Sequence, residues 1–195
     1  EVQRLQERLM ELNYLDIDES TQYFGSATRD ALTRFQRQHD LLQDGIAGPA
    51  TLEILYSADA KKYVLLEGTR GTDVDMFQAQ LVALGYLKRA TGYYGTETVA
   101  AVKAFQERNK LTVDGKAGEK TLETIYSENA KPSADKAREA RRKANISTMI
   151  ATAQKMIGRP YVLGATGPKS FDCSGLVYYC LKQAGSNRRR LNAAG

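Results

Sequence analysis

Apolar side chains recur at three- and four-residue intervals in two stretches of the chain, and this spacing predicts one apolar helix face in each stretch. The sequence after both stretches is also similar, so that residues 2–57 and 74–127 form an internal repeat. Each copy contains the pattern DG..G, at residues 44–48 and 114–118, which predicts a tight turn with positive φ. The apolar positions are Val2, Leu5, Leu9 and Leu12 in the first copy, and Val74, Phe77, Leu81 and Leu84 in the second.

Each copy of the repeat is expected to fold as three helices. The second helix is expected to begin near Ser26 in the first copy and near Thr96 in the second, since both residue types are favourable N-caps. Thr51 and Thr121 are expected to open a short third helix. The sequence therefore predicts a mainly α fold for the two repeats.

Several polar and aromatic side chains of the second helix have structural explanations. Phe35 and Phe105 continue the apolar face and are expected in the core. Gln36 and Gln106 follow them and are expected to satisfy nearby backbone groups. His39, the one histidine of the sequence, stands where the second copy has an asparagine, and a surface or capping role is expected for it rather than catalysis.

The segment after the repeats is polar and then changes character. Residues 128–145 are highly charged and predict a solvated linker, helical from Ser133 onward. Ser147 is expected to cap a further helix that ends at Gly158. A short β-rich run, Tyr161-Val162-Leu163, and a glycine-rich turn follow.

Cys173 begins a helical pattern near the end of the sequence, and Cys180 lies within that pattern. A cysteine at a helix N-terminus lies at the positive end of the helix dipole, which favours the nucleophilic thiolate. Asp172 and Ser174 make the surroundings of Cys173 polar, whereas Cys180 shares the apolar stripe and is expected to be a buried core thiol. Two cysteines seven residues apart on one helix are too distant for a disulfide, and with one histidine they provide no zinc-ligand set.

Composition and charge exclude some classes of protein. Hydrophobic residues make up 42% and charged residues 26%, and no apolar run approaches the ~20 residues that a membrane span needs. The net charge is +5, and residues 146–195 hold seven basic side chains and one acidic side chain. The run Arg188–Arg190 lacks interleaved aromatics, so a solvated surface run is favoured over binding to nucleic acid or another polyanion, such as an anionic wall polymer.

The repeat pattern LQ..L..L.YL, followed by (Y/F)(F/Y)G..T..A and DG..G..TL, resembles the small three-helix peptidoglycan-binding domain. The resemblance implies that the repeats hold a catalytic domain on the bacterial cell wall. A helical spacer that contacts only other proteins is the alternative. Aromatic side chains beside polar groups suit glycan or peptide contact, although rim packing is the favoured role for any single one of them. The candidates for contact are Tyr23, Phe24, Tyr93 and Tyr94.

Residues 158–175 contain Pro160-Tyr161-Val162, Gly167-Pro168 and Phe171-Asp172-Cys173-Ser174-Gly175, and they resemble the NlpC-type cysteine peptidases. The resemblance implies an α+β, papain-like domain of which the N-terminal part is present. It also implies that Cys173 is the nucleophile and that Tyr161, Asp172 and Ser174 line the substrate groove. The family cleaves stem peptides next to D-glutamate. Position 163 is Leu where Trp is usual, and position 165 is Ala where Gly is usual, which leaves the shape of the nearby pocket open.

A thiol peptidase also needs a general base, and no histidine follows Cys173. We therefore expect this chain to be the N-terminal portion of a longer, secreted, wall-associated hydrolase and to be inactive as given. A non-enzymatic peptidoglycan-binding protein with a peptidase remnant is the alternative. Peptidoglycan is the expected partner, no metal or cofactor is expected, and the oligomeric state stays open. The expected domains are residues 1–60 and 61–130 for the repeats, 131–145 for the linker, and 146–195 for the peptidase part.

Overall fold

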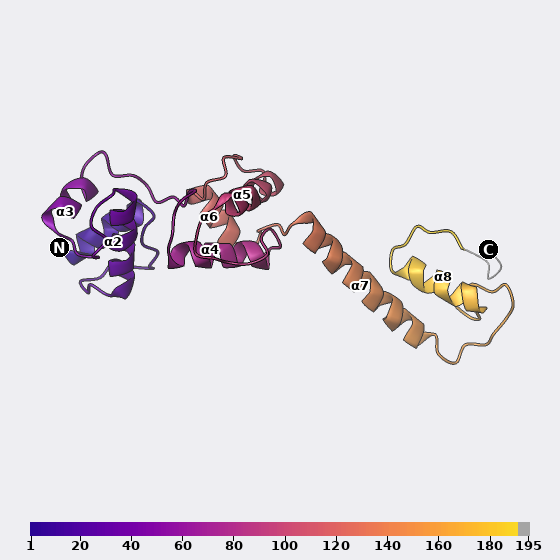
Figure 1. Cartoon of the computed structure of the whole chain (residues 1–195). Helices are drawn as coiled ribbons and strands as arrows, with labels where there is room; N and C mark the ends of the chain where they lie inside the picture. The colour runs from indigo at the N-terminus through magenta and orange to yellow at the C-terminus, as the bar shows by residue number, and fades with distance from the viewer. Residues whose placement is uncertain (191–195) are drawn as a thin grey trace. The chain divides into compact units, whose positions relative to one another are not determined.

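A computed structural model describes residues 1–190 of the chain, which fold as two compact units. The first unit is Glu1–Lys131 and the second begins at Pro132 (Figure 1). The described residues contain eight α-helices and no strand of a sheet beyond isolated backbone bridges. The mainly α prediction for the repeats is therefore confirmed.

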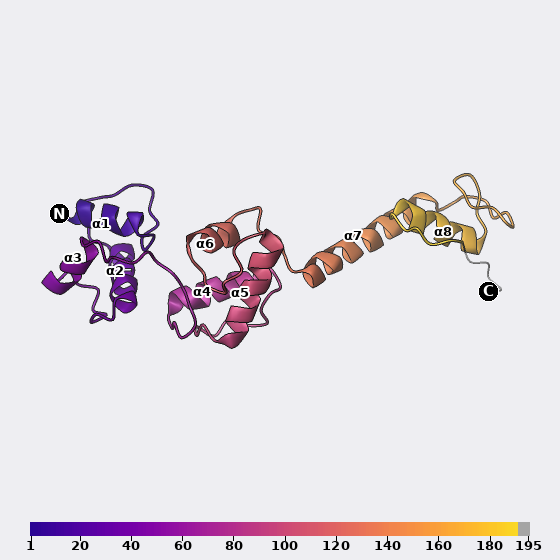
Figure 2. The same cartoon turned by 90° about the horizontal axis from the view of Figure 1, so that it is seen from above.

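The first unit contains two groups of three helices, one for each repeat (Figures 1 and 2). The first group is α1 (Val2–Glu11), α2 (Ser26–Gln38) and α3 (Pro49–Leu55). The second group is α4 (Thr72–Ala83), α5 (Thr96–Asn109) and α6 (Glu119–Tyr126). The predicted turns have the expected left-handed glycine in both copies, with φ of 68° at Gly45 and 76° at Gly115.

Glycines, not hydroxyl side chains, precede the second and third helices. Ser26 and Thr96 are the first helical residues and make no capping hydrogen bond, because the N-cap positions are Gly25 and Gly95. The predicted third-helix starts at Thr51 and Thr121 are wrong, since α3 and α6 begin two residues earlier, after the N-caps Gly48 and Gly118. Pro49 stands in the first turn of α3, where its fixed φ suits a helix and its missing N–H costs nothing.

One continuous apolar core runs through the first unit. The core contains the predicted Phe35 and Phe105, both fully buried. Their neighbours Gln36 and Gln106 are also buried and bind the DG turns, as predicted: the amide oxygen of Gln36 accepts from the N–H of Gly45 at 2.9 Å. Other fully buried large side chains are Leu9, Tyr14, Leu32, Leu55, Leu65, Phe77, Leu81 and Tyr94.

The segment between the repeats is tied to both of them. Arg37 on α2 binds the carboxylate of Asp73 on α4 through two hydrogen bonds of 3.0 and 2.5 Å. The hydroxyl of Tyr63 donates to the same carboxylate at 2.7 Å. Further along, Leu65 and Ala117 form an antiparallel bridge with bonds of 3.1 and 2.8 Å. Because these contacts join residues of both repeats, the repeats form one compact unit.

The second unit consists of α7 (Ala134–Lys155) and α8 (Cys173–Gln183), which pack together with the loop between them. The helix predicted from Ser133 is confirmed, because the Ser133 hydroxyl caps α7 by accepting from the N–H of Lys136. The cap predicted at Ser147 is wrong, since Ser147 lies inside this uninterrupted helix. None of the helices in the part described is long and apolar enough to cross a membrane.

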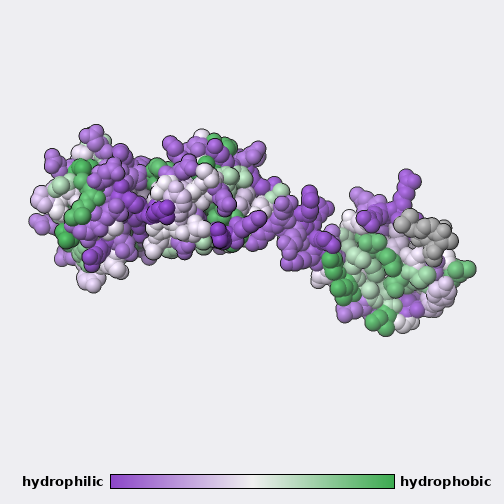
Figure 3. Space-filling view, viewed as in Figure 1, coloured by the Kyte–Doolittle hydropathy of each residue, from purple (hydrophilic) through white to green (hydrophobic). Residues whose placement is uncertain are grey.

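The second unit exposes many apolar side chains, and hydrophobic residues gather on the face of it that Figure 3 shows. No α7 residue is buried, although the helix presents two isoleucines, Ile146 and Ile150. The run predicted as β-rich pairs only through isolated bridges, between Tyr161 and Phe171 and between Thr166 and Phe171. The exposed large apolar residues are Ile146, Ile150, Ile157, Tyr161, Val162, Leu163 and Val177.

Candidate functional site

Cys173 is the first residue of α8, and it is exposed. The first N–H groups of a helix lack partners within the helix and carry partial positive charge, which favours a thiolate there. The helix forms at this point because the side chain of Asp172 caps it, accepting from the N–H of Gly175 at 2.6 Å. The thiol that the sequence predicts as the nucleophile is therefore accessible and lies at the N-terminus of a helix.

Asp172 organises the backbone around this thiol. One carboxylate oxygen accepts from the Ser174 hydroxyl at 2.9 Å as well as from Gly175, and the other accepts from the N–H of Gly164 at 2.8 Å. The hydrogen bond from Gly175 is the main reason that the pKa of Asp172 is lowered to about 2, with Ser174, Arg190 and Gly164 adding to it and burial opposing it. Asp172 is thus ionised throughout the physiological range.

Arg190 provides the counter-charge for Asp172. Its guanidinium forms an ion pair with the carboxylate and donates to the Ser174 hydroxyl at 3.0 Å and to the carbonyl of Gly164 at 3.0 Å. This arginine cannot be distinguished from Arg188 and Arg189 by sequence alone, because the three are consecutive. Arg190 is therefore not part of the solvated run that the sequence predicted.

The loop before α8 approaches the helix closely. A Cβ at position 175 would lie 2.0 Å from the carbonyl oxygen of Ala165, so only glycine fits there. The N–H of Asp172 donates to that same carbonyl at 3.0 Å. Phe171 anchors the loop by packing edge-on against Tyr179 at a centroid distance of 5.5 Å. Tyr161, predicted to line the groove, is exposed and bridges to Phe171 through its backbone.

Cys180, in contrast, lies in the interior of the second unit and is 4% exposed. Burial raises the pKa of its thiol, because the charged form is disfavoured away from water. Both cysteines are free. The structure thus separates one accessible thiol from one buried thiol on the same helix.

His39 has both ring nitrogens engaged in structural contacts in the first unit. Its Nδ1 donates to the carbonyl of Phe35 at 2.9 Å, and its Nε2 accepts from the N–H of Lys61 at 2.9 Å. This arrangement fits the capping role that the sequence predicted. Within residues 1–190, no cluster of three or more His, Cys, Asp or Glu side chains has the arrangement of a metal site.

The aromatic candidates of the first repeat line an open hollow of about 560 Å³. Tyr23 is 77% exposed, and Phe24 and Ile46 are also exposed beside it. Arg29 lies at the same hollow and supplies a positive charge. Apolar rings with one cation suit the sugar rings and carboxylates of a wall polymer.

The equivalent tyrosines of the second repeat have other contacts. The Tyr93 ring lies 4.0 Å under the guanidinium of Arg70. Tyr94 is fully buried, donates its hydroxyl to the carbonyl of Gly115 at 2.9 Å, and pairs through its backbone with Gly68 and Thr69. Tyr94, suggested by the sequence as a contact for peptidoglycan, is therefore a core residue and cannot reach a ligand on the surface.

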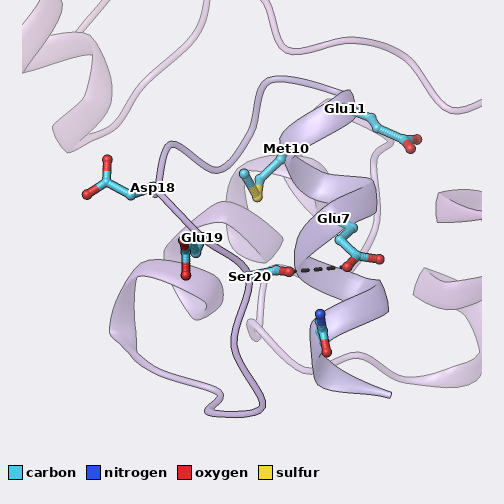
Figure 4. Close-up of a pocket in the computed structure, with 7 residues that line it drawn as sticks. Glu7, Met10, Glu11, Asp18, Glu19 and Ser20 are labelled. Atoms are coloured by element: carbon cyan, nitrogen blue, oxygen red, sulfur yellow. Dashed lines mark hydrogen bonds between the residues drawn. The ribbon is translucent and has the colours of Figure 1, made fainter.

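A second hollow of about 580 Å³ lies between α1 and the loop that follows it, and acidic side chains line most of it. Figure 4 shows Glu11 and Asp18 pointing away from each other, while the Ser20 hydroxyl donates to Glu7 at 3.2 Å. The carboxylates thus do not converge on one point.

Comparison with known families gives one match for the repeats and another for the segment around Cys173. The family model described as "Putative peptidoglycan binding domain" matches residues 1–55 and 70–125, more than half of the chain. The chain belongs to this family. A model of the NlpC/P60 family matches residues 158–194, the segment that carries Cys173. Both resemblances predicted from the sequence are therefore confirmed.

Similar proteins fall into the same two groups. A "Probable N-acetylmuramoyl-L-alanine amidase" of Bacillus licheniformis is 33% identical over 125 residues, which cover 53% of this chain and 35% of the amidase. The amidase CwlM of Mycobacterium tuberculosis is 34% identical over 110 residues, 53% of this chain and 27% of CwlM. A "Probable endopeptidase p60" of Listeria grayi is 48% identical over 42 residues, 22% of this chain and 8% of that protein. The chain thus spans about a third or less of each relative, and no solved structure matches it.

Proposed function

We propose that this chain belongs to a bacterial cell-wall hydrolase of the cysteine peptidase type, in which the two repeats bind peptidoglycan and Cys173 attacks the stem peptides. The observation that carries the proposal is the exposed Cys173 thiol at the N-terminus of α8, inside the segment that matches the NlpC/P60 family. The endopeptidase relatives support a peptide bond as the target. The resemblance to NlpC-type peptidases supports a bond next to D-glutamate.

In the proposed mechanism, the Cys173 thiolate adds to the stem-peptide carbonyl carbon. The C–N bond then breaks, and the amine leaves with a proton from the general acid, which forms a thioester on Cys173. Water hydrolyses the thioester, releasing the carboxylate and restoring the thiol. Asp172 fixes the helix start that carries the sulfur, and Tyr161 and Ser174 lie on the substrate side of it.

The sequence holds no histidine after Cys173 that could act as the general base of this mechanism. The one histidine of the sequence, His39, belongs to the first repeat and has both ring nitrogens engaged. We therefore propose that the chain by itself binds the wall and does not hydrolyse it. The same observation favours the second candidate function, a peptidoglycan-binding protein without peptidase activity.

Binding to the wall is assigned to the first unit, with residues 1–60 and 61–130 as the two binding domains and 131–145 as the connection to the peptidase part. The family match supports peptidoglycan as the partner, and a peptidoglycan partner supports a location outside the cytoplasmic membrane. Binding raises the concentration of stem peptide near Cys173, and two domains on one chain add avidity when both engage. Tyr23, Phe24 and Arg29 are the proposed contacts in the first domain.

Affinity labelling tests the assignment of Cys173 with the chain as it stands. A D-glutamyl peptide with a halomethyl ketone in place of the scissile amide is incubated with the protein, and the modified cysteine is located by peptide mass spectrometry. We expect labelling of Cys173 but not of Cys180, and a slower rate when unmodified stem peptide competes. A Cys173→Ala variant should take up no label, and a Cys180→Ala variant should label like the parent. Labelling that free stem peptide does not slow would contradict the proposal.

A further inference from the structure

Arg190 contacts the residues immediately before and after Cys173. Its guanidinium pairs with Asp172 and donates to the Ser174 hydroxyl at 3.0 Å. It also donates to the carbonyl of Gly164 at 3.0 Å, which ties the preceding loop to the helix start. One side chain therefore holds the elements on both sides of the thiol.

The counter-charge matters because the Asp172 carboxylate is both buried and adjacent to Cys173. Its side chain is 7% exposed, and it is the one acidic residue within residues 146–195. A buried, unpaired negative charge next to a thiol opposes formation of a second negative charge on sulfur. The Arg190 cation offsets this repulsion while leaving Asp172 free to cap the helix.

Neighbouring arginines do not share this position. Arg188 and Arg189 are exposed, and within residues 1–190 the structure gives their side chains no hydrogen bond or ion pair. The Arg190 side chain is 24% exposed. Other charged groups on the elements around Asp172 are Lys182 on α8, whose ammonium lies over the Tyr178 ring, and Arg159 and Lys169 in the preceding loop.

We propose that Arg190 is a positioning residue for the nucleophile: it neutralises the Asp172 carboxylate and orients Asp172 and Ser174 on either side of the Cys173 thiol. The inference rests on the proposed role of Cys173 as the nucleophile. The three arginines of the basic run therefore have different roles, since Arg190 contacts the site and Arg188 and Arg189 are exposed to solvent.

The test is the pH profile of Cys173 alkylation by iodoacetamide in the full chain, measured from pH 5 to 10 by peptide mass spectrometry. Arg190→Gln removes the charge and keeps a polar side chain, and Arg190→Lys keeps the charge. We expect Arg190→Gln to slow alkylation at pH 7 by about 3- to 10-fold and to move the half-maximal rate up by about 0.5–1 pH unit, because the unpaired carboxylate disfavours the thiolate. Arg190→Lys should stay close to the parent, and Arg189→Gln, the matched control, should not change the profile.

Two results would overturn the inference. One is an Arg190→Gln profile that superimposes on the parent, and the other is an equal shift in Arg189→Gln. Far-UV circular dichroism and the unreactivity of the buried Cys180 show whether α8 is retained. If Arg190→Gln loses the helix, the Arg190→Lys profile decides, since a shifted profile in a folded Lys variant contradicts a charge-based role. Alkylation needs neither peptidoglycan nor cleavage, so the affinity-labelling experiment can fail independently of this one.

Discussion

His39 and Asn109, seventy residues apart, make the same two contacts in their own repeats. His39 Nδ1 and Asn109 Nδ2 donate to the carbonyls of Phe35 and Phe105 at 2.9 and 2.8 Å. His39 Nε2 and Asn109 Oδ1 accept from the N–H groups of Lys61 and Lys131 at 2.9 and 3.0 Å. An imidazole with its proton on Nδ1 thus reproduces the donor and acceptor of an amide, which explains why this histidine has a structural role.

This equivalence predicts the effect of substituting His39. His39→Asn should change the free energy of unfolding by less than about 0.5 kcal/mol, because both hydrogen bonds are kept. His39→Ala should cost about 1 kcal/mol or more, since the Lys61 N–H and the Phe35 carbonyl lose their partner. Urea unfolding of the three proteins measures both differences. A loss in His39→Asn as large as in His39→Ala would show that the two side chains are not equivalent.

Gln36 and Gln106 are predicted to contribute strongly to stability. Each buried amide serves a DG turn and a threonine: Gln36 Nε2 donates to Asp44 at 2.8 Å and to Thr51 at 3.2 Å. Replacement of Gln36 by Leu, which is similar in size, leaves the Gly45 N–H without its acceptor and should cost roughly 2 kcal/mol or more. Gln38→Leu, on the partly exposed side of the same helix, is the control and should cost less.

The pair of Arg37 and Asp73 predicts a loss of stability in acid. Burial opposes ionisation of Asp73, but hydrogen bonds from Arg37 and Tyr63 outweigh it and hold the pKa of the carboxyl below its usual value of 3.8. The contribution is therefore complete above about pH 4 and is lost as the pH falls toward the lowered pKa of the folded state. Asp73→Asn should cost about 1–3 kcal/mol at pH 7 and less at pH 3, measured by urea unfolding. A difference that is the same at both pH values would contradict this assignment.

Tyr23 and Tyr94 are predicted to affect different properties. Tyr23→Ala should weaken binding to purified peptidoglycan by about tenfold, a loss of roughly 1.4 kcal/mol, with little change in melting temperature, because the ring is exposed. Tyr94→Phe should lower the melting temperature and leave binding unchanged, because its hydroxyl bonds inside the core. Sedimentation with the wall and thermal unfolding separate the two effects. Equal wall affinity in Tyr23→Ala and the parent would remove Tyr23 from the binding surface.

The helices and turns of the first unit could be predicted because their signals are local. Apolar spacing located the helices, and the DG pattern located the turns at Gly45 and Gly115. Helix caps were predicted less well. Thr51 is a residue type that suits an N-cap, but its hydroxyl instead accepts a hydrogen bond from Gln36, fifteen residues earlier. Hydrogen bonds of that range depend on tertiary packing, which residue preferences at one position do not contain.

At the site too, features that depend on neighbouring residues were predicted, and contacts between distant residues were not. The start of α8 at Cys173 follows from adjacent residues and was predicted, whereas Asp172, predicted to line the substrate groove, is the buried N-cap of the helix. Arg190 was not predicted, because three consecutive arginines are equivalent in sequence, and only the fold determines which of them turns toward the carboxylate. The contact between Arg37 and Asp73 was not predicted either, because these residues lie 36 positions apart and only the fold brings them together.

Sedimentation of the 195-residue chain with purified peptidoglycan is the most direct check of the proposed function, which requires wall binding to bring Cys173 to stem peptides. We expect the parent and Cys173→Ala to enter the pellet with equal affinity, and soluble peptidoglycan fragments to release both. A chain that stays in the supernatant at every wall concentration would rule out the proposed function.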